Sequence, residues 1–153
     1  IHSALIGTVE RYIFAALDTA VKLEKEGKVP SLPLWLTPVQ VRIVPVSDSF
    51  TYRARELLSE IEGANIRADL DDRPESISKR VRDAEVNWIP YIAVIGEKEM
   101  KTGLLTVRKR ETGEQKPMSV PELIEEVTSR TRGYPRIGLK MPSLLSQRPV
   151  YKS

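Results

Sequence analysis

The stretch of sequence that decides the fold is ADLDDRPESISKRVRDAEVNWIPYIAVIGEKEMKTGLLTVRKR, residues 68–110. It indicates a strand, an acidic turn, a basic amphipathic helix, a buried strand and a basic hairpin, because its apolar spacing changes from strand-like to helical and back. Pro74 suits the first turn of the helix, whose apolar stripe begins at Ile77 and ends at Trp88. Cationic groups then lie at the ends of elements whose apolar sides face a core. This layout predicts a rigid docking surface for an anionic partner.

Strand-like and helical patterns also alternate on both sides of this stretch. Short β-branched or apolar runs predict strands, and apolar stripes opened by capping residues or closed by glycine predict helices. Strands are expected at 39–46, 65–70, 91–95, 104–110 and 115–118, and helices at 3–26, 50–63, 74–88 and 119–127.

The order of these elements predicts how the strands pair. Strands joined through a helix pair in parallel with right-handed crossovers, which place helices on both faces of the sheet. The last strands follow one another through short turns and so form an antiparallel edge. The sequence therefore predicts an α/β fold, with three α/β/α layers and a mixed five-stranded sheet, preceded by one helix.

Four parts are expected along the chain. Residues 1–27 form a helix, which Gly27 ends in a left-handed cap. Residues 28–38 form a linker, because its three prolines exclude a helix and a central strand. Residues 39–132 are the α/β domain, and residues 133–153 are a basic tail.

Composition sets limits on the class of protein. The chain has 153 residues, of which 41% are hydrophobic and 29% charged, so it can bury a core. It has no apolar run long enough to span a membrane, and we expect a cytoplasmic location. The absence of cysteine excludes disulfides, thiolate catalysis and cysteine-based zinc sites in this chain. The one histidine, His2, excludes a self-contained Ser-His-Asp device.

The net charge of +3 is unevenly distributed. From residue 130 to the end there are six Lys or Arg residues and no acid. A one-sided basic tail favours a polyanion or an anionic surface as partner. The alternative is a solubilising tail that lies on its own domain.

Two features could form a catalytic or metal site. Asp69, Asp71 and Asp72 follow a strand and could hold a divalent ion, but acids ahead of a helix also favour its dipole and cap its amides. We favour the second interpretation and expect no metal site. Gly96 has no companion glycines and no following helix, so a phosphate-binding loop is not expected. The chain alone is expected to be non-catalytic.

Binding chemistry is better supported. Lys79, Arg80 and Arg82 are expected on the outer side of the third helix, and Arg108 lies on the hairpin strand. Cations contact phosphates, and an arginine on a rigid strand can bind a base edge through two parallel hydrogen bonds. Glu99 is the one carboxylate among these cations. It is either an ion-pair partner or an acceptor for the N1–H and amine of an unpaired guanine.

Four separated blocks carry a more specific pattern: WLTPVQVRIVPVSDS, ADLDDRPESISKRVRDAE, IPYIAVIGEKE and LLTVRKRETGE. The match spans roughly residues 30–128, and these blocks resemble the anticodon-binding domain of class II aminoacyl-tRNA synthetases. Within that family, PLWLTPVQV at 33–41 points to the threonyl enzymes. The closing residues, 135–153, resemble the archaeal branch.

The resemblance implies roles for particular residues. Glu99 and Arg108 match positions that read anticodon bases in threonyl enzymes, whose tRNA anticodons carry a central G followed by U. The loop before the third helix departs from the bacterial pattern, and Arg73, Glu75 and Ser76 are its candidate base readers. Phosphates or the RNA backbone would be contacted by Lys79, Arg80, Lys98 and Arg110.

The first residues resemble the end of motif 3 of the class II catalytic domain. Residues 1–27 would then be a remnant of that domain, and the arginine that matches Arg11 contacts ATP in the family. Motifs 1 and 2 and the zinc ligands of threonyl enzymes have no counterpart here, so no cofactor is expected in this chain. The resemblance implies ATP, Mg and Zn in the parent enzyme only.

The resemblance implies the tRNA-binding part of a threonine–tRNA ligase, with the anticodon stem-loop of tRNA(Thr) as partner and a parent that dimerises through its catalytic domain. One alternative is a threonyl-synthetase-like protein that edits mischarged tRNA. Another is a non-catalytic RNA- or protein-binding module of the same fold.

Overall fold

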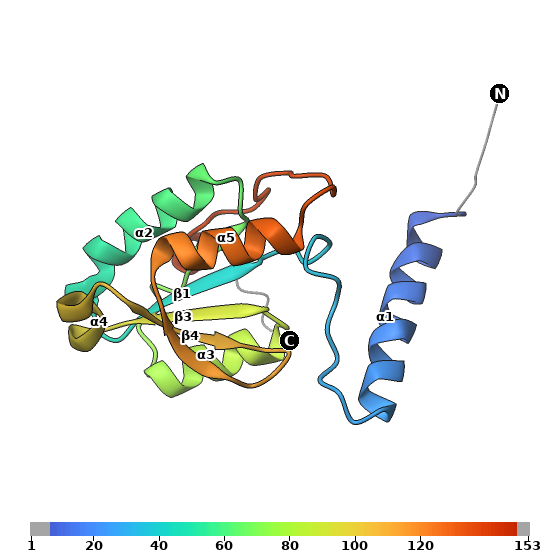
Figure 1. The fold of residues 1–153 in the computed structure, drawn as a ribbon, viewed down its shortest axis with the longest axis horizontal. Helices are drawn as coiled ribbons and strands as arrows, with labels where there is room; N and C mark the ends of the chain where they lie inside the picture. The colour runs from blue at the N-terminus through green and yellow to red at the C-terminus, as the bar shows by residue number, and fades with distance from the viewer. Residues whose placement is uncertain (1–6, 150–153) are drawn as a thin grey trace.

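The computed structural model describes residues 7–149, in which five strands form one mixed sheet of order β2-β1-β3-β4-β5 (Figure 1). β1 pairs in parallel with β2 and β3, and β4 runs antiparallel to both β3 and β5. The predicted parallel core with an antiparallel edge is therefore confirmed. The strands are β1 Val41–Pro45, β2 Ala68–Leu70, β3 Tyr91–Ile95, β4 Leu105–Lys109 and β5 Gln115–Met118.

Helices lie on both faces of the sheet, as the three-layer prediction requires (Figure 1). α2 (Thr51–Gly63), which follows the short 3-10 helix η1 (Asp48–Phe50), and α5 (Val120–Arg130) cover one face. They bury the larger cluster of apolar side chains, which includes Leu57 and Leu123.

α3 (Ile77–Val86) covers the other face, but only over the central strands. Its Ala84 packs with Val44 of β1 and Ile92 of β3 in a second, smaller cluster. The same face of β4 and β5 carries Thr106, Arg108, Gln115 and Pro117, none of which is fully buried. The part of the sheet beside α3 is therefore left open.

A short helix, α4 (Glu97–Thr102), follows Gly96 directly, so the expectation that no helix follows this glycine is wrong. The Glu99 carboxylate accepts a hydrogen bond from the Gly96 amide at 3.0 Å, which is one half of a capping box. Any larger residue at 96 would place its Cβ 2.8 Å from the Val46 side chain. Six residues are too few to show helical periodicity, so the Gly-x-x-Glu cap was the available signal.

The limits of α3 also differ from the prediction. Ser76, not Pro74, opens the helix, because the Ser76 hydroxyl accepts a hydrogen bond from the amide of Lys79. Trp88 lies beyond the end of the helix with a φ of 57° and does not belong to its apolar stripe.

The first helix, α1 (Val9–Lys25), stands apart from the three layers (Figure 1). Gly27 follows it with a φ of 75°, which confirms the predicted left-handed cap. Residues 3–6 of the predicted helix lie outside the described residues. Within residues 7–149, α1 and the other helices all lack the length and apolar character that a membrane crossing needs.

The connector between α1 and the sheet is fixed to the domain. Arg67 donates hydrogen bonds to the carbonyls of Trp35, Thr37 and Ile137, and so joins the connector to the tail. The ring of Trp35 also stacks on Tyr134, with ring centroids 4.9 Å apart.

The basic tail folds back onto the domain as far as residue 149. Leu144 forms a parallel bridge with Leu70 at the outer edge of β2, and the Leu70 amide donates to the carbonyl of Ser143. Next to this bridge is a short 3-10 helix, η2 (Leu145–Gln147). The tail covers a sheet edge that would otherwise expose unpaired backbone groups. These contacts agree with the alternative in which the tail lies on its own domain.

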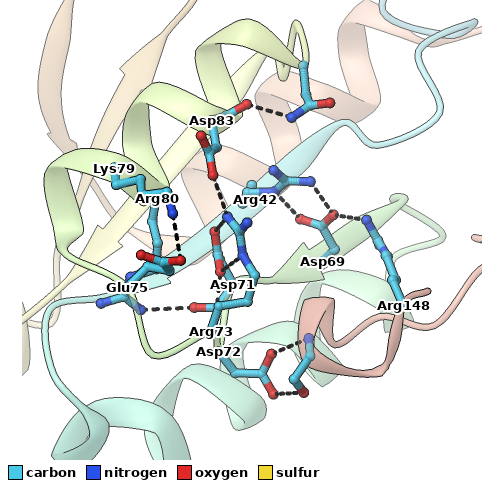
Figure 2. A network of polar contacts seen from close by, with 12 residues as sticks. Arg42, Asp69, Asp71, Asp72, Arg73, Glu75, Lys79, Arg80, Asp83 and Arg148 are labelled. Atoms are coloured by element: carbon cyan, nitrogen blue, oxygen red, sulfur yellow. Dashed lines mark hydrogen bonds and ion pairs between the residues drawn. The ribbon is translucent and has the colours of Figure 1, made fainter. Parts of the chain in front are cut away.

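An ion triad fixes the end of the tail (Figure 2). Asp69 is fully buried and accepts two hydrogen bonds of 2.8 Å from Arg42, itself 4% exposed. Arg148 of the tail approaches the same carboxylate at 2.9 Å. The acid thus lies between one arginine of the central sheet and one of the tail.

Asp69→Ala should strongly destabilise the fold, because it leaves Arg42 buried without a counter-ion. Losing one partner of a buried ion pair costs about 3–5 kcal/mol, and urea denaturation measures this change in the free energy of unfolding. The control is Asp18→Ala, which removes a solvent-exposed pair with Lys22 and should cost less than about 1 kcal/mol. Equal small losses in both variants would contradict the role of the triad.

Candidate nucleic-acid interface

The open part of the sheet forms a surface between α3, α4 and the β4–β5 hairpin. We call this surface the open face, and it consists of two adjoining grooves. The first, of about 230 Å³, lies beside α4 and is lined by Lys98, Glu99, Thr102, Leu104, Thr106, Gln115, Lys116 and Pro117. The second, of about 330 Å³, lies between α3 and β4 and is lined by Ile77, Ser78, Val81, Arg82, Glu85 and Arg108.

Glu99 is held in the first groove by two hydrogen bonds. Its Oε2 accepts from the Gly96 amide, and its Oε1 accepts from the Thr106 hydroxyl at 2.6 Å. Partial burial alone would raise the pKa of the Glu99 carboxyl, but the Thr106 hydroxyl and the nearby backbone amides outweigh it, so its pKa lies below the ordinary value. Glu99 is therefore a fixed anion at neutral pH.

Arg108 lies in the second groove, on the same side of β4 as Thr106. Its Nε is 2.8 Å from Oε1 of Glu85, on the last turn of α3. The floor of this groove is apolar, formed by Ile77 and Val81. Glu99 and Arg108 thus occupy different grooves, and Thr106 of the first groove lies two residues before Arg108 on the same face of β4.

The loop before α3 is held by ion pairs of its own (Figure 2). Arg73 pairs with Asp71 at 2.6 Å and with Asp83 at 3.0 Å. The hydrogen bonds to Asp71 raise the pKa of Arg73 above its ordinary value, against the opposing effect of burial. Glu75 pairs with Lys79 at 2.6 Å. These contacts fix the backbone at the start of α3.

Arg80 departs from the prediction. It was expected on the outer side of α3, but it is only 5% exposed, and its Nη1 donates to the carbonyl of Asp71. A run of basic residues does not show which of its members is buried. Here the whole Arg80 side chain is buried, including Nε of its guanidinium, while Lys79 and Arg82 are exposed.

The other predicted cations lie in three different places. Lys98 is exposed on α4, in the first groove. Arg110 is half-buried behind the open face, where it donates to the carbonyls of Pro30 and Glu85 and lies over the ring of Trp88. Arg11 is exposed on α1, apart from the three layers.

Two residues of the open face were not singled out from the sequence. Glu85 lies in the second groove beside Arg108, and Gln115 lies in the first groove, paired across the strands with Arg108. The number of residues between α3 and β4 does not show which acid of α3 forms an ion pair with which arginine of β4. The alternation along β5 was the available signal for Gln115.

The three acids in and directly after β2 have protein partners. Asp69 and Asp71 bind arginines, and Asp72 accepts from the amide and hydroxyl of Ser146 in the tail. Among the described residues, no cluster of three or more acid or histidine side chains has the arrangement that a metal ion would need. These acids hold the loop and the tail, and the prediction that they cap α3 is wrong, because Ser76 caps that helix.

Thr106→Val should raise the pKa of Glu99 relative to the unmodified chain, because it removes one donor to the carboxylate. A lowered folded-state pKa stabilises the fold above the ordinary carboxyl pKa, and this stability is lost as the pH falls through the folded value. The variant should therefore start to unfold at a higher pH in acid. A carboxyl-carbon NMR titration measures the pKa directly.

The matched control is Thr102→Val, whose hydroxyl donates to the Lys98 carbonyl instead. It should leave the pKa of Glu99 unchanged. The same pKa in Thr106→Val and in the unmodified chain would show that the hydroxyl does not hold the anion.

Known proteins are similar to this chain in sequence. The anticodon binding domain family matches residues 40–130. The threonine–tRNA ligase of Pyrobaculum calidifontis is 54% identical over 150 residues, which cover 98% of this chain and 24% of that protein. The ligase of Thermofilum pendens is 51% identical over 151 residues, covering 99% and 25%. The chain thus spans about a quarter of the length of the curated relatives it matches.

A solved structure agrees with these matches. The RNA binding domain of threonyl-tRNA synthetase from Cryptosporidium parvum Iowa II has 29% identity and a TM-score of 0.67, covering 86% of this chain and 31% of that one. The family match over residues 40–130, the sequence identity to the ligases and the similarity to the solved structure all indicate the same family. The chain belongs to the anticodon-binding domain family, and it is similar to the members of that family in archaeal threonine–tRNA ligases.

Proposed function

We propose that the open face binds the anticodon loop of tRNA(Thr), as part of a threonine–tRNA ligase. The observation that carries this proposal is the fixed, ionised carboxylate of Glu99 on the same side of β4 as Arg108. A surface that only attracted phosphates would gain nothing from an anion held in place there. A surface that reads bases needs both an acceptor and a donor.

The contacts of Glu99 leave room for a base. A carboxylate has about four lone-pair sites, and the Gly96 amide and the Thr106 hydroxyl occupy one on each oxygen. The remaining sites can accept from the N1–H and the exocyclic amine of an unpaired guanine. This is the base at the centre of a threonine anticodon.

The cations around Glu99 have different tasks in this proposal. Arg108 contacts a base edge, while the exposed Lys98, Lys79 and Arg82 contact phosphates. Arg73, Glu75 and Ser76 present their loop to the RNA. Arg80 and Arg110 act from behind the surface, since their donors are turned to backbone carbonyls.

The parent protein is proposed to be the aminoacylating enzyme. The matched relatives named above are threonine–tRNA ligases, which supports this choice over an editing protein. The parent would use ATP, Mg and Zn in a catalytic domain that lies outside these residues, with Arg11 near the ATP. It would act as a cytoplasmic homodimer.

Arg108→Ala should weaken binding of a threonine anticodon stem-loop by about 1–3 kcal/mol and reduce the preference for the threonine anticodon. The substitution removes the guanidinium that would bind the base edge. Fluorescence anisotropy with the cognate stem-loop and with variants changed at one anticodon base measures both effects. Unchanged discrimination would contradict the assignment of Arg108 as a base reader.

Lys98→Ala should weaken all of these RNAs alike. One phosphate contact fewer lowers the slope of log K against log salt by roughly 0.7–0.9, and titrations at several salt concentrations give that slope. A matched control is Lys22→Ala on α1, away from the open face, which should change neither affinity nor slope. A selective loss for one anticodon would assign Lys98 to a base instead.

A further inference from the structure

Glu85 is in an unusual position for a residue on an RNA-binding surface. Its carboxylate pairs with the Nε of Arg108 at 2.8 Å, and both side chains are 36% exposed. An anion beside a base-reading arginine opposes the approach of phosphates, so it reduces the general affinity for RNA. A negative charge at this place must therefore improve another property of RNA binding, such as its specificity.

The geometry of the pair offers such a gain. The ion pair joins Nε of Arg108 to the Glu85 carboxylate. Among the described residues, no hydrogen bond is formed by Nη1 or Nη2, so these two groups at the end of the guanidinium remain available as donors to a base edge. The ion pair therefore holds the guanidinium beside α3 and leaves its outer end for recognition.

Glu85 is also held by Arg110, which follows β4 directly. Its backbone carbonyl accepts a hydrogen bond from Nη1 of Arg110, and Arg110 also reaches the carbonyl of Pro30 and lies over Trp88. The last turn of α3 is thus attached to the end of β4 at two points. The backbone hydrogen bond holds the segment from which the Glu85 carboxylate reaches Arg108.

We propose that Glu85 is a positioning residue that determines specificity, acting through Arg108. It orients the guanidinium toward a base and its negative charge discourages a phosphate from taking the base's place. This inference rests on the proposed function, since it needs Arg108 to contact the anticodon loop. A neutral base edge meets no repulsion from Glu85, whereas a phosphate does, so the anion separates the two modes of binding.

Glu85→Gln tests the charge while keeping the size of the side chain. Freed from its counter-ion, Arg108 should bind phosphates, so all RNAs should bind more tightly and the salt slope should steepen by roughly 0.7. The ratio of affinities between the threonine stem-loop and its single-base anticodon variants should fall at least about threefold, which is about 0.65 kcal/mol. Glu85→Asp keeps the charge but draws it back from Nε, so it should lower the ratio with little change in slope.

The control is Glu56→Gln, which removes the same charge from an ion pair of similar exposure with Arg53 on α2. It should leave the affinity ratio unchanged. The same Glu85 substitutions are then made in an Arg108→Ala background. If Glu85 acts through Arg108, they should no longer alter the ratio there.

The outcomes separate the two levels of the proposal. If the unmodified chain binds all the stem-loops equally, the proposed function fails. If it discriminates but Glu85→Gln keeps the full ratio, or changes it equally with and without Arg108, only the inference about Glu85 is overturned. A uniform loss of affinity with lowered thermal stability would assign Glu85 a structural role, and it also overturns the inference.

Discussion

Helix α3 has ten residues and covers only the two central strands on its side of the five-stranded sheet. On the other side, α2 and α5 cover a longer stretch of sheet and bury the main core. The side chains of β4 and β5 beside α3 therefore have no helix over them. The grooves that contain Glu99 and Arg108 exist because α3 does not extend over this part of the sheet. They lie on the surface and are not cavities inside the core.

Buried charges hold the frame of this surface. The Arg42–Asp69–Arg148 triad joins the central sheet to the tail, and the Asp71–Arg73–Asp83 contacts fix the loop that leads into α3. Three of the cations predicted to contact RNA therefore bind groups of the domain itself: Arg73, Arg80 and Arg110. Preorganised side chains favour recognition because less freedom is lost when a ligand is bound.

The sequence predicted the strands, the pairing order and the three layers, because alternating apolar patterns depend on which faces are buried. It did not predict α4, whose six residues are too short for periodicity and depend on the cap by Glu99. It placed Arg80 on the outside, although the whole side chain is buried, and it could not show that Glu85 pairs with Arg108. These contacts depend on how α3 is set against β4, which local sequence does not specify.

The measurement that tests the central claim most directly is an NMR titration of the chain with a threonine anticodon stem-loop. Shifts of backbone amides locate the contact surface without any substitution. The account predicts the largest shifts at α4, at Thr106 and Arg108 on β4, along β5 and on the exposed side of α3. Shifts confined to α2, α5 or the tail at the edge of β2 would contradict it, because the RNA would then bind the covered face or the far edge of the sheet.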